Sequence, residues 1–230
     1  MRSPGAHASP AIDPDRTAPA ALYAPRPAPS MDRSFHIDPG CDMQTGKREE
    51  LLATAERLFY EEGFHATGID RVVAGAGVAR MTLYNHFPSK EALIEQVLER
   101  RFHRYLDELR DTIDRRGGAT AVTALVECHC RWLRSASREG CIVIKAIAEF
   151  EHHSAGIARQ GRQLEQELLA LIRDALARDG QPADAAAAER VLLALEGANT
   201  LAPVLGPGRA AAHLRAMLPA ALGACAAESA

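Results

Sequence analysis

Long apolar runs, strand-forming runs and aromatic residues are all scarce in this sequence of 230 residues. No stretch of about 18 apolar residues is present, so a membrane span is not expected. The N-terminus also lacks the apolar segment of a secretion signal. The five cysteines are an odd and scattered set, which indicates reduced thiols rather than a disulfide framework. These absences predict a cytoplasmic protein with no membrane partner.

Ala, Leu, Arg and Glu are abundant, and this mixture favours helices over strands, so we predict an all-α fold. The chain is long enough for one large core or two small ones. Its formal net charge of −3 gives no general attraction to nucleic acid. Binding to DNA would therefore require a local basic face.

Residues 1–45 are rich in Pro and Ala and show no apolar periodicity. Such a segment cannot bury enough apolar surface to offset the entropy of ordering, so we predict a disordered tail. Met31 and Met43 offer later start sites. Whether the tail belongs to the natural protein is therefore left open.

From Lys47 onward, apolar residues recur at helical spacing until Gly63, which predicts a first helix. Thr67 has the character of an N-cap, with Asp70 three residues later in a capping-box arrangement. A second helix should therefore begin there and end at Gly77, where glycine permits a tight turn.

A third helix is expected from Arg80 up to Pro88, which ends it. Val78 and Leu83 have the spacing of a hydrophobic staple, and Leu83 and Phe87 should both point inward. The polar side chains of this helix are then left for its outer face. Two short helices joined by a small-residue turn are typical of a helix-turn-helix, whose second helix enters the major groove of DNA.

A long helix capped by Ser89 follows, to about Arg116. Further helices are expected at about 119–138, 141–151, 154–178, 184–202 and 209–225. Pro219 should kink or shorten the last one. We therefore predict a three-helix, helix-turn-helix DNA-binding domain at 46–92 and a helical effector-binding and dimerisation domain at 93–230.

The stretch AGVARMTLYNHFPSKEAL (residues 76–93) resembles the DNA-binding domain of the TetR/AcrR family of bacterial transcriptional regulators, over about residues 47–100. The resemblance implies a homodimer on a palindromic operator in double-stranded DNA, with recognition helices about 34–36 Å apart or a small multiple of that. It also implies a repressor, released when a small-molecule effector moves the long helix that connects the two domains. The identities of the effector and the operator stay open.

The resemblance also implies individual DNA contacts. Arg80, Met81 and Thr82 match positions that read bases, and an arginine there can form a bidentate bond with guanine. Tyr84 and His86 match phosphate contacts, Thr67 matches a phosphate contact through the second helix, and Lys90 matches a backbone anchor. The predicted DNA-facing set is Thr67, Arg80, Met81, Thr82, Tyr84, Asn85, His86 and Lys90. The alternatives are a solvated Arg80 and a Tyr84 ring that only packs against the first helix.

In the C-terminal part, the candidates for an effector pocket are His129, Trp132, Cys141, Ile144 and Phe150. His129 could instead be a hydrogen-bonded core histidine, and Cys141 could pack as a small apolar group or sense oxidants. Cys128, His129 and Cys130 alternate along one helix and point to nearly opposite sides. We therefore expect no metal site in the protein, and no cofactor.

The last two helices are expected to form the dimer contact. Their small and apolar residues suit close helix packing, and the candidates are Gly197, Ala198, Ala202, Leu214, Leu218 and Leu222. No nucleophile elbow, phosphate loop or HExxH motif occurs, so no catalytic residues are assigned and no enzyme is expected. Alternative functions are a helical protein-interaction adaptor and a thiol-based redox-sensing regulator.

Overall fold

A computed structural model describes residues 39–181 and 185–223, and every regular element in these ranges is a helix. The all-α prediction is confirmed. Most of the predicted tail, with Met31, lies outside the described residues. The first helix begins at Pro39, so the end of the segment predicted to be disordered is helical instead.

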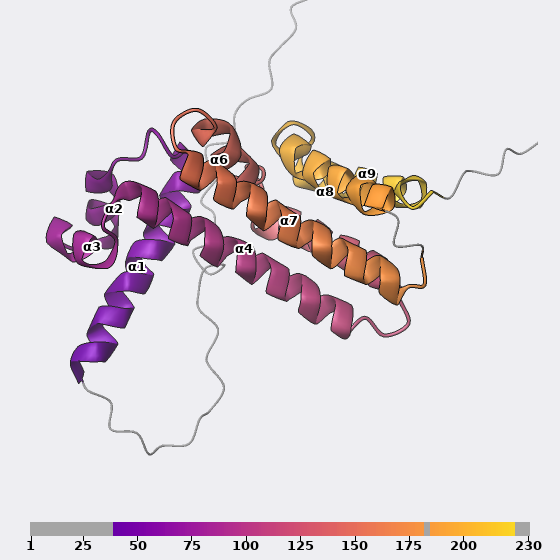
Figure 1. The fold of residues 1–230 in the computed structure, drawn as a ribbon, viewed down its shortest axis with the longest axis horizontal. Helices are drawn as coiled ribbons and strands as arrows, with labels where there is room; N and C mark the ends of the chain where they lie inside the picture. The colour runs from indigo at the N-terminus through magenta and orange to yellow at the C-terminus, as the bar shows by residue number, and fades with distance from the viewer. Residues whose placement is uncertain (1–38, 182–184, 224–230) are drawn as a thin grey trace, which may run out of the picture. The chain divides into compact units, whose positions relative to one another are not determined.

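The helices α1 (Pro39–Glu62), α2 (Ile69–Ala76) and α3 (Arg80–His86) pack against one another in the N-terminal part (Figure 1). Gly77 follows α2 with φ of +65° and ψ of +30°, a left-handed conformation that glycine adopts without strain. The apolar residues at helical spacing face a common core, in which the side chains of Leu58, Val72, Leu83 and Phe87 are buried. The predicted order of three helices, with two short ones joined by a turn at Gly77, is confirmed.

The long helix α4 (Lys90–Asp114) connects this part to the rest of the chain. The Ser89 hydroxyl accepts a hydrogen bond from the Ala92 backbone N–H at 3.0 Å, as the predicted N-cap requires. Helix α4 packs against α1 and also against α5 (Ala121–Ser135) and α7 (Ala155–Arg178). A single helix therefore packs against both the N-terminal and the C-terminal helices, whose buried apolar residues form one cluster.

The remaining helices are α6 (Ile142–Phe150), α8 (Ala185–Leu205) and α9 (Pro207–Ala221). Helices α8 and α9 lie side by side (Figure 1), and α9 also packs on α5. Helix α9 ends soon after Pro219, as expected from a residue that cannot continue the backbone hydrogen-bond ladder. Among the described helices, none combines the length and the apolar character that crossing a membrane requires.

Two buried contacts join α1 to the C-terminal part. The Arg101 guanidinium of α4 donates to the Glu56 carboxylate at 3.0 Å and to the Ala136 carbonyl. Burial favours the neutral form of Glu56, but Arg104 and Arg101 outweigh it and lower its pKa below the usual value. Tyr60 supplies the second contact, because its hydroxyl donates to the Gly140 carbonyl at 3.0 Å.

Candidate functional site

The outer face of α3 carries most of the predicted DNA-facing residues. Arg80, Met81, Tyr84 and Asn85 are exposed, and Met81 keeps 69% of its surface accessible. Thr82, His86 and Lys90 are half-buried. Leu83 and Phe87 on the inner face are at most 1% exposed. The sequence therefore separated the two faces of this helix correctly.

Arg80 is held in place by its neighbours. Its guanidinium lies 3.1 Å from the Asp70 carboxylate and 5.9 Å from the centre of the Tyr84 ring. A hydrogen bond with Tyr84 and the charge of Asp70 raise the pKa of Arg80 further. The arginine, the tyrosine and the exposed end of α2 therefore form one continuous polar surface.

Lys90 is the first residue of α4, where the helix dipole disfavours a cation. Partial burial lowers the pKa of Lys90, while the nearby carboxylates of Glu91 and Glu149 act in the opposite direction. The ammonium group is therefore favoured by two carboxylates and disfavoured by the helix dipole and by partial burial.

The prediction for Thr67 was wrong on two counts. Gly68, not Thr67, is the N-cap of α2, and no side chain caps that helix. The Thr67 side chain is completely buried, and its hydroxyl lies 2.8 Å from the Gly63 carbonyl oxygen and 3.3 Å from that of Leu58. A hydroxyl enclosed in this way fixes the turn after α1 and cannot reach a phosphate.

The C-terminal part contains a cavity of about 30 Å³ between α4, α5, α6 and α8. Phe102, Tyr105 and Trp132 line its aromatic side, and Cys141, Glu196 and Asn199 line its polar side. Two predicted pocket residues, Trp132 and Cys141, therefore do meet at one cavity. Its volume holds about one or two water molecules, so an organic effector would require the pocket to open.

His129 is a core histidine with no exposed surface. Its Nδ1 lies 2.6 Å from the Tyr105 hydroxyl, and burial lowers its pKa to about 4. It supports Tyr105 from behind instead of lining the cavity. Of the two readings that the sequence left open for His129, the structure favours the hydrogen-bonded core residue.

Two other pocket assignments were wrong. Phe150, at the end of α6, packs its ring 5.6 Å from that of Phe64 and 4.9 Å from that of His65. The C-terminal end of α6 lies against the turn after α1, so Phe150 packs on that turn and not in the cavity. Ile144 is half-buried on α6 and is absent from the cavity lining.

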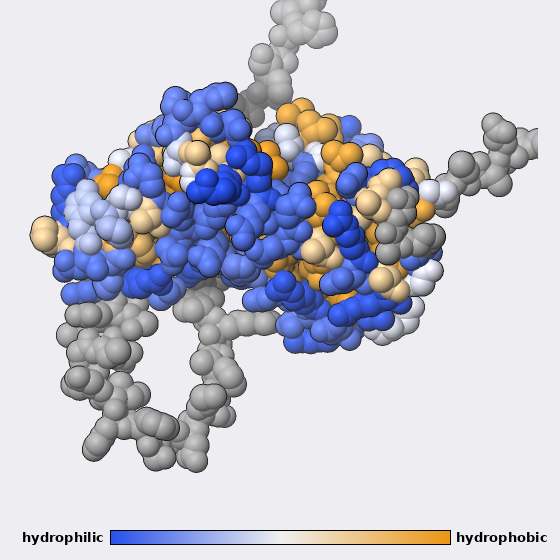
Figure 2. Space-filling model, viewed as in Figure 1, coloured by the Kyte–Doolittle hydropathy of each residue, from blue (hydrophilic) through white to orange (hydrophobic). Residues whose placement is uncertain are grey.

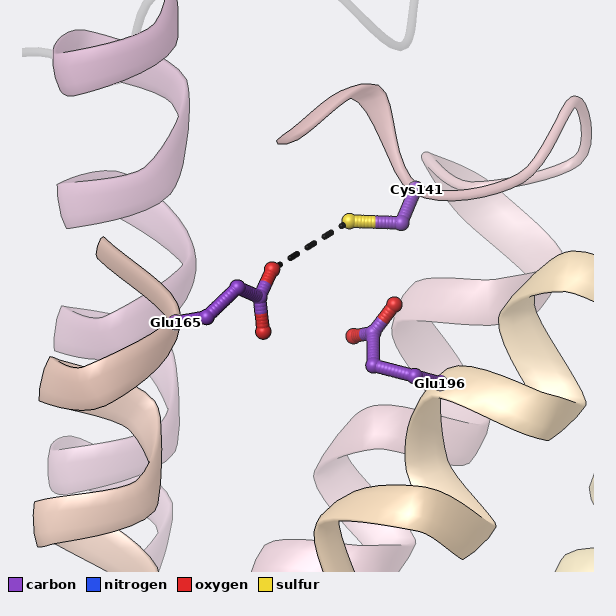
Figure 3. A group of neighbouring side chains, drawn as sticks. All are labelled: Cys141, Glu165 and Glu196. Carbon is purple, nitrogen blue, oxygen red and sulfur yellow. Dashed lines mark hydrogen bonds between the residues drawn. The ribbon is translucent and has the colours of Figure 1, made fainter. Parts of the chain in front are cut away.

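The most unusual buried group was missed by the sequence reasoning. Figure 3 shows Glu165 of α7 and Glu196 of α8 pointing toward the Cys141 thiol, which lies 3.8 Å from the Glu165 carboxylate. Burial, and then the Glu196 carboxyl, raise the pKa of Glu165 to about 8. Burial and the same two carboxyls raise the pKa of the Cys141 thiol well above its usual value. A carboxylate within the apolar stripe of α7 was the signal available for Glu165.

The family model described as "Bacterial regulatory proteins, tetR family" matches residues 51–97, which include α2, α3 and the start of α4. A solved TetR-family transcriptional regulator from Streptomyces coelicolor superposes with a TM-score of 0.71 at 28% identity, covering 78% of this chain and 96% of that one.

Residues 51–97 of the chain therefore belong to the tetR family of bacterial regulatory proteins.

Curated relatives share a shorter part of this chain. The transcriptional regulator UidR of Escherichia coli strain K12 is 30% identical over 102 residues, which are 44% of this chain and 50% of the relative. The transcriptional repressor KstR2 of Rhodococcus jostii strain RHA1 is 38% identical over 66 residues, 29% of this chain and 30% of the relative. The match thus spans half or less of the length of these relatives.

The chain has an apolar surface on α8 and α9. Figure 2 shows hydrophobic residues gathered over these two helices, whereas most of the rest of this face is hydrophilic. The exposed apolar residues there are Leu193, Leu201, Val204 and Met217, and we call them the α8–α9 face. A shallow groove of about 120 Å³ runs between the two helices beside Gly197.

The α8–α9 face only partly coincides with the predicted dimer residues. Gly197, Leu218 and Leu222 are half-buried. Ala198, Ala202 and Leu214 are nearly or completely buried within the chain, because their small or apolar side chains are used to pack α8 against α9 and α5. As direct dimer contacts these three were wrong.

Proposed function

We propose that this protein is a sequence-specific, DNA-binding transcriptional regulator that acts as a homodimer and represses until an effector releases it from its operator. The observation that carries the proposal is the face of α3. There, polar and aromatic side chains are exposed on a helix whose opposite face is fixed in the core. The tetR family model covers this same helix.

On this proposal, Arg80, Met81 and Thr82 read base edges. An exposed arginine near the start of α3 matches the commonest specific contact, a bidentate bond to guanine. Tyr84, Asn85, His86 and Lys90 would bind the phosphate backbone, which sets affinity and register. Thr67 contributes indirectly by fixing the turn that places α2.

The α8–α9 face is the proposed dimer contact. Several large apolar side chains are exposed together there, which is unusual for a surface in contact with water. A two-fold contact of this kind would present two copies of α3 to successive turns of the DNA groove. The cavity beside Trp132 is the proposed starting point of an effector pocket.

The test is a binding assay with a DNA fragment selected from genomic DNA by the purified protein. Arg80→Ala should weaken binding by roughly tenfold or more and relax the preference for one base position. Tyr84→Phe should weaken binding to all sequences and leave the fold intact. Unchanged binding by both variants would exclude α3 as the DNA-binding element.

The dimer is tested separately by sedimentation. Leu201→Glu places a charge on the α8–α9 face and should give monomers that no longer bind the palindromic fragment, since each half-site alone binds weakly. Ala170→Glu, at an exposed position of α7, is the matched control and should stay dimeric. A Leu201→Glu protein that remains dimeric would place the contact elsewhere.

The alternative of a thiol-based redox sensor is less well supported. A reactive cysteine needs a stabilised thiolate, whereas burial and two carboxyl groups raise the pKa of Cys141. Cys128 and Cys130 are buried too, and burial raises the pKa of each. The alternative of a protein adaptor leaves the polar face of α3 without a role.

A further inference from the structure

Three potential metal ligands converge in the interior of the C-terminal part. Cys141 is the N-cap of α6, Glu165 lies on α7 and Glu196 lies on α8, and Figure 3 shows their side chains directed toward one another. One ligand atom from each residue lies within 4.8 Å of the other two. Gly161, one turn before Glu165, allows this approach, since a Cβ there would meet an Ile147 side-chain carbon at 2.6 Å.

The cluster is incomplete as a hydrogen-bonded group. Glu165 is only 7% exposed, and within the described part of the chain Oε2 of Glu165 and Oε2 of Glu196 have no hydrogen-bond partner. Buried carboxyl oxygens without partners cost free energy. The only basic side chain that lines the adjacent cavity, Arg101, is engaged with Glu56 and the Ala136 carbonyl. A bound cation would satisfy the free oxygens.

We infer that Cys141, Glu165 and Glu196 form a binding site for a divalent ion of the zinc class. A thiolate excludes Mg²⁺ and Ca²⁺ as preferred occupants, whereas zinc accepts sulfur and carboxylate ligands together. With bonds of about 2.3 Å to sulfur and about 2.0 Å to oxygen, tetrahedral zinc separates S and O ligands by about 3.5 Å. The separation of 3.8 Å between Cys141 Sγ and Glu165 Oε1 is close to that value.

The surroundings favour an ion over an organic cation. The cavity that borders Cys141 and Glu196 measures about 30 Å³, which accommodates a water molecule as a fourth ligand but is far smaller than pockets for organic ligands. The remaining carboxylate oxygen of Glu196 is already oriented, because Asn199 Nδ2 donates to its Oε1 at 3.1 Å. On zinc binding, the thiol proton and any proton held by the two carboxyl groups pass to solvent, since each ligand binds the metal in its deprotonated form.

The test uses the full chain after treatment with a chelator, and it does not involve DNA. Zinc chloride titrated in a calorimeter should bind at one ion per chain with high affinity, and the unfolding midpoint should rise with zinc concentration. Cobalt should give the absorption band of a thiolate–cobalt bond. Cys141→Ala, Glu165→Gln and Glu196→Gln should each weaken zinc binding by at least about tenfold.

Two matched controls separate this site from others. Cys128→Ala removes a buried thiol outside the cluster, and His153→Ala removes a surface histidine whose ring lies 5.5 Å from that of His65. Both should keep the high-affinity site. Zinc binding that survives Cys141→Ala, that is lost in His153→Ala, or that magnesium matches in strength would overturn the inference, as would no binding at all.

Discussion

The two candidate functional regions differ in the burial of their polar side chains. On α3 the polar groups are exposed and the apolar Leu83 and Phe87 are buried. In the C-terminal part the polar groups of interest, His129, Glu165 and Asn199, are buried in an otherwise apolar core. An exposed polar face suits a large, hydrated partner such as DNA, whereas buried polar groups suit a small ligand that is enclosed.

The largest effect on stability is expected when a buried charge is removed. Arg101→Met should lower the free energy of unfolding by about 3–5 kcal/mol, since it deprives the buried Glu56 of a partner. Arg104→Met is the control, because Arg104 binds the same carboxylate from a position that is 43% exposed, and it should cost less. Chemical denaturation measures both, and equal losses would mean that burial does not decide the effect.

The apolar face of α3 should behave as core. Leu83→Ala is expected to cost about 2–5 kcal/mol in the free energy of unfolding, because a buried leucine leaves a cavity. Met81 lies two residues before Leu83, on the exposed side of the same helix. Met81→Ala should therefore change the free energy of unfolding by less than about 0.5 kcal/mol. If denaturation curves gave the two variants similar stabilities, α3 would not be anchored by Leu83.

His129 predicts a pH dependence of stability. Burial lowers its pKa to about 4 in the folded protein, so the unfolded chain binds a proton at higher pH than the folded one does. The contribution of neutral His129 to the free energy of unfolding is complete above about pH 6.5. It is lost as the pH falls toward 4, by up to ~3 kcal/mol. His129→Gln should flatten this part of the stability profile, while the exposed His152→Gln should leave it as it is.

The smallest effect is expected at the exposed ion pair beside α3. Asp70→Ala should leave the unfolding midpoint unchanged, since surface ion pairs contribute little. Removing a negative charge next to Arg80 should nevertheless strengthen DNA binding by roughly twofold to tenfold. A fluorescence titration at two salt concentrations checks this, and weaker binding would mean that Asp70 positions Arg80 for its contact.

Local patterns were sufficient for most of the N-terminal part. The staple of Val78 and Leu83, the turn at Gly77 and the cap at Ser89 are all short-range signals, and the helices follow them. Thr67 was misassigned because its partners, the carbonyls of Leu58 and Gly63, come close only when the chain folds back after α1.

Longer-range features could not be predicted from the sequence for a related reason. Helix α8 is rich in Ala and Leu on several sides, so hydrophobicity alone does not say that Ala198 faces inward while Leu201 faces out. Glu165 and Glu196 are separated by 31 positions, and only the packing of α7 against α8 brings them together. Helix α7 carries many charges and α8 carries three, and neither carboxylate by itself indicates that the other lies beside it.

The loop between α5 and α6 links α8 of the C-terminal part to α1 of the N-terminal part through hydrogen bonds. From Glu196 a run of hydrogen bonds leads through Asn199 to the Ser137 hydroxyl. The Gly140 carbonyl lies 3.1 Å from that hydroxyl and accepts a hydrogen bond from the Tyr60 hydroxyl. A bound ion that displaces the Glu196 carboxyl would either lengthen these hydrogen bonds or move the loop with it. The far end of this run is α1, against which α2 and α3 pack. On the proposed function, the run would connect Glu196 to the DNA-binding helices by a second route besides α4.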